Sequence, residues 1–255
     1  MKGIILAAGR GSRMNHMTND RPKCLLNLSG KPLLEWQLTS LRDGGVDDIL
    51  VVSGYMADKL AGDFKTLYNP RWNKSNMIET LRQASSWLEN EPCIVSYSDI
   101  VYHSDHVKSI SKSPAVIAIT FDTLWKDLWE LRFTNPLSDA ETFIQKDGFL
   151  KEIGNTTTNI SLIQGQYMGL VKFTPEGWHI VSELLESLTQ DQIDKLDMTA
   201  LFNIMLKKDI AIETIPVNGR WCEADSMSDI DIYESTISQS EKTNTLWPHD
   251  WRIKA

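Results

Sequence analysis

The sequence predicts a doubly wound α/β fold with a mostly parallel β-sheet and a small antiparallel β insertion. Three observations support this fold class. Short apolar runs alternate with helical periods in the first half of the chain, as in sheets built from parallel strands and crossover helices. A glycine-rich loop directly follows the first apolar run. In the second half the runs are shorter, and a tight turn separates two of them.

The first half supplies the elements of the parallel sheet. Leucines recur at helical spacing after Pro32, and Gly44 and Gly45 mark the end of that helix. A second helical period begins at Asn76, so helices are predicted over residues 32–41 and 76–88. Apolar runs predict buried strands at residues 1–6, 49–53, 93–97 and 115–121.

The second half predicts shorter strands, at residues 129–133, 141–146, 149–153 and 166–173. Asp147 and Gly148 form a hairpin turn between the second and the third of them. We expect these strands to form an antiparallel flank or lid beside the parallel sheet. Further helices are predicted over residues 175–188, 198–207 and 227–237, and the last strands over residues 211–217 and 220–223.

Composition and charge limit the function classes. We expect a single domain over residues 1–255, because no Pro/Gly/Ser-rich linker or repeat interrupts the chain. The net charge of −8 argues against a nucleic-acid or anionic-membrane partner, and no segment approaches the roughly 20 apolar residues of a membrane span. Cys24, Cys93 and Cys222 form no metal-binding or disulfide pattern. We therefore expect a cytoplasmic protein with buried thiols.

The loop between Leu6 and Lys23 has the composition of an anion-binding cradle. Gly9 and Gly11 allow the backbone conformations that turn several amide N–H groups toward one ligand. Arg13 and Lys23 add a planar guanidinium and a compact ammonium, which suit a triphosphate. The alternative is a surface turn that carries arginines. The spacing matches neither the Walker loop nor a complete G-x-G-x-x-G motif, which excludes those two classes.

Two aspartates are placed to hold a magnesium ion. Asp99 follows the predicted strand at residues 93–97, and Asp225 follows the last predicted strand together with Glu223. Since ligands of open parallel sheets bind at the carboxyl ends of the strands, we expect both carboxylates to face the glycine-rich loop. Mg²⁺ needs only one or two carboxylates besides phosphate and water, so the pair is sufficient. The alternative is that both residues are turn formers or helix caps.

The run L-A-A-G-x-G-[ST]-R-[LM], followed by P-K, resembles the signature of nucleotidyltransferases that join an NTP to a phosphorylated small molecule. Within that family the chain is most similar to the phosphocholine-type cytidylyltransferases. The resemblance extends over nearly the whole chain and implies a Rossmann-like nucleotidyltransferase fold with catalytic Mg²⁺ at Asp99 and Asp225. Tyr97 replaces the first aspartate of the common D-x-D motif, which implies a single carboxylate there and argues against a two-metal arrangement.

The resemblance also implies that the first part, about residues 1–120, holds CTP or another NTP. Lys23 and Arg13 would be the catalytic charges on the phosphates, and the backbone of residues 6–8 and Gly54 would hold the pyrimidine. For Gly54 and Tyr55 a simple strand-ending turn is the alternative. The expected nucleotide-binding residues are Leu6, Ala7, Ala8, Gly9, Gly11, Ser12, Gly54, Tyr55, Asn76 and Ser98.

The reaction that this family carries out is an in-line attack of the acceptor phosphate on the α-phosphorus of the NTP, with loss of pyrophosphate. The catalysis then comes from positioning and from electrostatic stabilisation. We expect neither a protein nucleophile nor a general base, because the acceptor phosphate is already largely ionised near neutral pH.

The part at about residues 121–240 is expected to bind the small phosphorylated acceptor. Aromatic rings could hold a trimethylammonium group, acidic residues an amine, and Arg132 a carboxylate, so phosphocholine, an aminophosphonate and a phosphorylated amino acid all fit. Because Trp125 and Trp129 are four residues apart, a helix face packed into the core is their alternative. The expected acceptor-binding residues are Trp125, Trp129, Arg132, Tyr167 and Asp197.

Two further features stand apart from this site. His103 and His106 could be metal ligands, but a solvated helix face is the interpretation that their spacing favours. The tail at residues 241–255 carries Trp247 and Trp251, which need a surface to cover. We expect the tail to dock on the parent domain or on a second subunit of a homodimer.

Three other functions remain open at this point. One is a sugar-1-phosphate nucleotidyltransferase that uses UTP, GTP or dTTP. Another is a glycosyltransferase with a similar nucleotide-binding sheet, although that enzyme would not need Arg13 and Lys23 so close to the loop. The third is a catalytically silent nucleotide-binding regulatory domain, which Tyr97 keeps open because it stands in place of an acidic residue.

Overall fold

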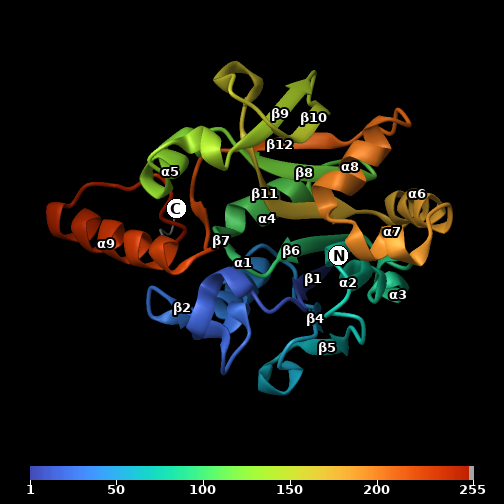
Figure 1. Ribbon diagram of the computed structural model, residues 1–255, viewed down its shortest axis with the longest axis horizontal. Coiled ribbons are helices and arrows are strands. Elements are labelled where there is room, and N and C mark those ends of the chain that lie inside the picture. Colours follow the sequence, from blue (N-terminus) through green and yellow to red (C-terminus); the bar gives the residue numbers. More distant parts are fainter. Residues whose placement is uncertain (253–255) are drawn as a thin grey trace.

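The computed structural model describes residues 1–252, so the last three residues of the predicted tail, 253–255, lie outside the described residues. Across the described range, nine strands form one sheet in the order β5-β4-β1-β6-β11-β8-β12-β10-β9 (Figure 1). Their bounds are β1 Lys2–Ala7, β4 Ile49–Ser53, β5 Lys65–Tyr68, β6 Cys93–Tyr97, β8 Ile117–Asp122, β9 Glu141–Lys146, β10 Phe149–Thr156, β11 Gln166–Phe173 and β12 Glu213–Val217.

Most strands of this sheet run in the same direction, as predicted. β1 pairs in parallel with β4 and β6, β4 pairs in parallel with β5, and β8 with β12. β11 runs against its neighbours β6 and β8, and β10 runs against β12 and β9. The predicted antiparallel insertion is therefore present, but its hairpin extends the main sheet at one edge.

Helices cover both faces of the sheet, which confirms the doubly wound α/β fold class. Ile5 packs into the core beneath α1, α4 and α5, whereas its neighbour Ile4 points to the core beneath α2, α6 and α8. Figure 1 shows α6, α7 and α8 on one side and α5 and α9 on the other. The helices are α1 Leu33–Asp43, α2 Met77–Arg82, α3 Ser85–Leu88, α4 Ser104–Ser111, α5 Trp125–Arg132, α6 Pro175–Glu186, α7 Gln190–Lys195, α8 Met198–Leu206 and α9 Met227–Thr243.

None of the helices within residues 1–252 combines the length and the apolar character that crossing a membrane requires.

Two predicted elements are wrong. Residues 129–133 do not form a strand, because Trp125, Leu128 and Trp129 share the buried face of α5 and this helical spacing decides the local structure. The helix predicted over residues 76–88 is broken between α2 and α3. At the break, Ser85 Oγ donates to the carbonyl of Arg82 at 2.6 Å, so a side chain occupies an acceptor near the helix end.

Two small sheets lie beside the large one. β2 (Asn27–Leu28) pairs with β3 (Lys31–Pro32), and β7 (Ile100–Tyr102) pairs with β13 (Trp221–Glu223), each in antiparallel fashion. The strand predicted at residues 220–223 thus belongs to a separate sheet with β7. This pairing brings the segment after β13 to the turn after β6, where Ala224 N donates to the carbonyl of Asp99 at 2.9 Å.

The tail packs on its own chain. Of the two predicted docking surfaces, the parent domain and a second subunit, the structure shows the parent domain. Trp251 is 2% exposed and meets Trp36 of α1 edge to face, with ring centroids 5.9 Å apart. His249 Nε2 lies 3.0 Å from Asp122 Oδ2 at the end of β8, and both side chains are fully buried. The other oxygen of Asp122 accepts from Gly219 N at 2.7 Å. Asp122 therefore joins the tail to the sheet.

We expect His249→Ala to lower the free energy of unfolding by about 3–5 kcal/mol, because it leaves the buried Asp122 carboxylate without its partner. Burial alone would raise the pKa of Asp122, but the hydrogen bond and charge of His249, together with the backbone N–H groups of Gly219 and Leu124, outweigh burial and hold that pKa below its usual value of 3.8. The contribution of the pair is therefore present above about pH 4 and is lost as the pH falls through the lower, folded-state pKa.

Urea unfolding at pH 7 and at pH 3 measures both effects. His179→Ala, which changes an exposed histidine of α6, is the matched control and should leave the stability nearly unchanged. Equal stability of His249→Ala and the wild type at pH 7 would contradict the role of the pair.

Candidate active site

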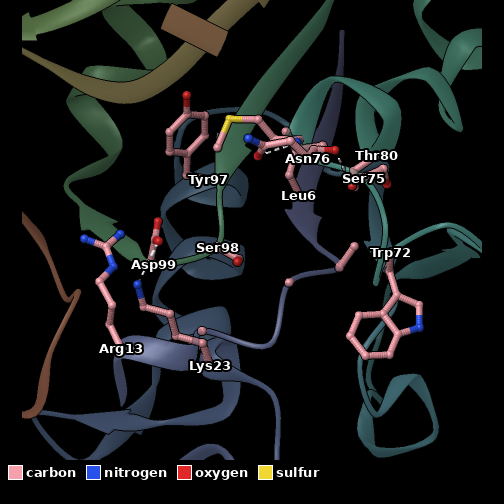
Figure 2. A pocket seen from close by; sticks show the side chains of 14 residues that line it. Leu6, Arg13, Lys23, Trp72, Ser75, Asn76, Thr80, Tyr97, Ser98 and Asp99 are labelled. Atoms are coloured by element: carbon pink, nitrogen blue, oxygen red, sulfur yellow. Dashed lines mark hydrogen bonds and ion pairs between the residues drawn. The ribbon is translucent and has the colours of Figure 1, made fainter. Parts of the chain in front are cut away.

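A pocket opens at the carboxyl ends of β1 and β6, where the chain enters the glycine-rich loop and the turn at Asp99 (Figure 2). Ligands of open parallel sheets bind at this kind of edge. The pocket is lined by Leu6, Ala8, Gly9, Gly11, Arg13, Lys23, Trp72, Ser75, Asn76, Met77, Thr80, Tyr97, Ser98 and Asp99.

The glycine-rich loop owes its shape to Gly11. This residue has φ 71°, in the left-handed region that favours glycine. A Cβ atom at this position would lie 2.7 Å from Cβ of Lys23, so any larger residue would displace the lysine. Gly11 therefore combines the turn of the loop with close packing on Lys23.

Lys23 lies between two carboxylates. Its Nζ donates to Asp99 Oδ2 at 2.8 Å and to Asp225 Oδ1 at 2.7 Å, and its side chain is only 7% exposed. Burial alone would lower the pKa of Lys23, but the two carboxylates outweigh burial and raise it. The lysine is therefore a fixed positive charge at neutral pH, held at the pocket wall.

Asp99, Glu223 and Asp225 form an acidic cluster beside Lys23, with one carboxylate oxygen from each within 4.8 Å of the others. Asp99 lies in the turn between β6 and β7, Glu223 is the last residue of β13, and Asp225 follows it, so the β7–β13 sheet brings them together. Arg13, whose side chain is 71% exposed, reaches Asp225 at 3.0 Å. Two cations and three carboxylates thus meet at one end of the pocket.

The donor set of this cluster fits a hard divalent cation. Asp99 Oδ1 is buried and, among residues 1–252, has no hydrogen-bond partner. Burial, and next the nearby Asp225, raise the pKa of Glu223, which reflects the crowding of negative charge. Burial would likewise raise the pKa of Asp225, but Lys23 outweighs it and lowers that pKa. Oxygen ligands and excess negative charge are what Mg²⁺ requires of a protein site.

Arg132 supports the acidic cluster from behind. Its side chain is 1% exposed, and its Nε donates to Asp229 Oδ1 at 3.0 Å, while Nη1 lies 3.5 Å from Glu223 Oε2. Asp229 in turn accepts from the backbone N–H of Asp225 at 2.9 Å. Arg132 was predicted to bind an acceptor carboxylate, but this geometry makes it a buried support for the cluster.

The other predicted acceptor-binding residues lie in three different settings. Trp125 and Trp129 are 4% and 3% exposed and belong to the core, which favours the alternative of a packed helix face. Tyr167 lies behind the pocket lining and meets Tyr97 edge to face, with ring centroids 5.8 Å apart. Asp197 caps α8, because its side chain accepts from Ala200 N at 2.8 Å.

Most of the predicted nucleotide-binding residues gather at the pocket. Leu6, Ala8, Gly9, Gly11, Asn76 and Ser98 line it. Ala7 is buried within β1 and Ser12 is exposed, and neither is part of the lining. Gly54 and Tyr55 lie behind the loop: Tyr55 N donates to Ala8 O at 2.9 Å, and the Tyr55 hydroxyl donates to Thr18 O at 2.8 Å.

The interpretation of His103 and His106 as a solvated helix face is wrong for His106. This side chain is 5% exposed, and its Nε2 lies 3.0 Å from the carbonyl oxygen of Gly219. His103 caps α4 through its Nδ1, which accepts from Asp105 N at 3.1 Å. Both residues therefore shape the fold around β7 and β13.

Sequence reasoning missed one wall of the pocket. Trp72, Ser75 and Thr80 line it, and they come from the loop after β5 and from the start of α2. This loop, N-P-R-W-N-K-S-N, is short and polar, and it lines the same pocket as the glycine-rich loop and the turn at Asp99. Its position between a strand and a helix was the signal that could have identified it, because such loops lie at the ligand-binding edge.

Comparison with known proteins agrees with this geometry. The family model of the MobA-like NTP transferase domain matches residues 3–124 of the sequence. The CTP:phosphoglutamine cytidylyltransferase of Campylobacter jejuni is 33% identical over 249 residues, which cover 91% of this chain and 98% of that protein. A choline-phosphate cytidylyltransferase of Haemophilus influenzae is 36% identical over 106 residues, which cover 40% of this chain and 45% of that protein.

Solved structures show the same fold. The inositol-1-phosphate CTP transferase from T. maritima superposes with a TM-score of 0.73 at 19% identity, over 94% of this chain and 96% of that one. The CTP:phosphocholine cytidylyltransferase from Streptococcus pneumoniae gives a TM-score of 0.69, also at 19% identity, over 92% of this chain and 98% of that one. Because the likeness to the Campylobacter protein runs over nearly the full length of both chains, this chain belongs to the nucleotidyltransferase family and is an enzyme with cytidylyltransferases among its relatives.

Proposed function

We propose that the enzyme transfers CMP from CTP to a small phosphorylated or phosphonate acceptor, with Mg²⁺ as cofactor and release of pyrophosphate. The observation that carries this proposal is the position of Lys23, a buried cation fixed by Asp99 and Asp225 beside the glycine-rich loop. The choice of CTP is supported by relatives whose names specify CTP or cytidylyl transfer. We place the reaction in the cytoplasm, because the three cysteines are free and buried, which fits a reducing compartment.

Each part of the pocket has a role in this reaction. The backbone of residues 8–11 and the cations Arg13 and Lys23 bind and orient the phosphates. Asp99 and Asp225 would hold Mg²⁺, which would neutralise phosphate charge when bound. Positioning the acceptor phosphate in line with the α-phosphorus then supplies much of the rate, because two anions must be brought together. The protein provides fixed charges and no covalent intermediate.

The burial of Arg132 changes how an acceptor carboxylate would be held, and the three acceptor classes are kept. Since Arg132 is buried and already bonded to Asp229, an acceptor carboxylate would not find its guanidinium. We place the acceptor beside Tyr97, which lines the pocket near Asp99 and has the ring of Tyr167 packed against it. Phosphocholine, an aminophosphonate or a phosphorylated amino acid whose carboxylate is bound elsewhere fits these surroundings.

A pyrophosphate-release assay tests the proposal. Each of CTP, UTP, GTP and dTTP is incubated with Mg²⁺ and one acceptor from a panel of phosphocholine, aminoethylphosphonate, phospho-amino acids and sugar 1-phosphates. We expect release with CTP and a member of the first three classes. Release with sugar 1-phosphates alone would favour the sugar-nucleotide alternative. Two of the relatives have names that specify a sugar 1-phosphate as substrate. No release with any pair would favour the silent regulatory domain.

Lys23→Ala should lower turnover by about 10²-fold or more, because it removes a preorganised cation from the phosphate site. The control is Lys126→Ala, which changes an exposed lysine on the outer face of α5 and should leave turnover unchanged. Thermal unfolding of both variants confirms that they are folded at the assay temperature. Undiminished turnover of a folded Lys23→Ala enzyme would contradict the proposal.

Asp225→Asn should raise the Mg²⁺ concentration needed for half-maximal activity by about 10- to 100-fold, because it removes a charged metal ligand. A Mg²⁺ titration at saturating CTP measures the effect. Asp231→Asn, at an exposed position of α9, is the matched control and should keep the wild-type titration curve. An identical Mg²⁺ requirement in Asp225→Asn and the wild type would remove Asp225 from the metal site.

A further inference from the structure

Trp72 forms the wall of the pocket that lies farthest from the charged groups. Figure 2 shows its indole on the opposite side of the pocket from Arg13 and Asp99, with the end of β1 between them. Trp72 is partly exposed and lines the pocket together with Leu6 and Ala8. Its polar neighbours in the lining, Ser75 and Asn76, carry no charge. This end of the pocket therefore suits a flat, uncharged group.

The loop that carries Trp72, residues 69–76, is held rigidly. Asn69 is fully buried, and its backbone N–H donates to Ser53 O at 2.8 Å. Its side chain binds the loop on both sides, because Nδ2 donates to Thr80 Oγ1 at 3.1 Å and Oδ1 accepts from Arg71 N at 2.9 Å. At the far end of the loop, Asn76 N donates to Asp194 O at 2.7 Å. A loop fixed at both ends holds the indole in one position.

Gly54 and Tyr55 support the indole from the turn after β4. A Cβ atom on Gly54 would collide with Cβ of Trp72 and would lie 2.6 Å from the carbonyl oxygen of Ala8, so only glycine allows Trp72 to approach β1 this closely. Tyr55 packs against the indole with ring centroids 5.5 Å apart and an interplanar angle of 60°. The indole is therefore packed against both Gly54 and Tyr55.

We propose that Trp72 is the stacking residue for the nucleobase of the bound nucleotide. The inference rests on the proposed function, since it takes the ligand to be a nucleoside triphosphate whose phosphates lie at Arg13 and Lys23. A base is a flat, uncharged aromatic group at the other end of such a ligand, and it matches the neutral end of the pocket. Stacking on an aromatic side chain is blind to the identity of the base, so this contact supplies affinity rather than base selection.

Isothermal titration with two ligands tests this role. CTP and inorganic tripolyphosphate, which has no base, are each titrated in the presence of Mg²⁺ into the wild type, Trp72→Ala and Trp72→Phe. We expect Trp72→Ala to weaken CTP binding about 5- to 150-fold, which corresponds to ~1–3 kcal/mol for one stacked base, and to leave tripolyphosphate binding unchanged. Trp72→Phe should restore most of the CTP affinity, because it retains an aromatic face.

Two further variants complete the design. Trp87→Ala removes a partly exposed tryptophan of α3 that lies beneath Lys2 and Lys65 and outside the pocket, so it should bind CTP as the wild type does. Gly54→Ala should weaken CTP binding through displacement of Trp72. In steady-state assays the loss in Trp72→Ala should appear as a higher KM for CTP with kcat largely kept.

The outcomes separate the inference from the function on which it rests. Wild-type CTP affinity in Trp72→Ala would overturn the stacking role alone, and so would an equal loss of CTP and tripolyphosphate binding, since that pattern means a damaged phosphate site. A wild-type protein that binds no nucleoside triphosphate would overturn the proposed function as well.

Discussion

The structure of the pocket depends on the two ion pairs of Lys23. They join the glycine-rich loop to Asp99, in the turn after β6, and to Asp225. Asp225 lies 202 residues after Lys23 in the chain. A buried ammonium is costly without partners, so Lys23 is stable at this position only beside the carboxylates of Asp99 and Asp225. Arg132 and Asp229 repeat this arrangement one layer deeper. The charges at the pocket are therefore fixed before any ligand binds.

This fixed arrangement gives the pocket two unlike ends. At one end Arg13, Lys23 and the acidic cluster concentrate charge, although the chain as a whole is acidic. At the other end Trp72 and uncharged polar side chains form a neutral wall. A ligand with a polyanion at one end and a flat ring at the other can enter in one orientation only. Such preorganised orientation is what an in-line displacement requires.

The second half of the chain serves the pocket mainly through support. Trp125 and Trp129 anchor α5 in the core, which places Arg132 behind Glu223 and Asp229. The tail closes the same region from outside, because His249 binds Asp122 at the end of β8. Trp125, Trp129 and Arg132, which looked suited to binding an acceptor, instead support the acidic cluster. Of the aromatic residues considered for the acceptor, Tyr167 lies nearest the pocket wall, because its ring contacts that of Tyr97.

The sequence by itself determined the α/β fold class, the loop from Gly9 to Lys23 and the two aspartates after strands, because strand ends, glycines and charges in such loops are local signals. Only the tertiary structure decided what depends on contacts between distant segments. The order of the strands, the β7–β13 pairing that brings Asp225 to Asp99, and the burial of Arg132 and Trp129 are of this kind. Trp72 belongs with them, since a tryptophan in a polar loop becomes a pocket wall only when Gly54 lets that loop pack against β1.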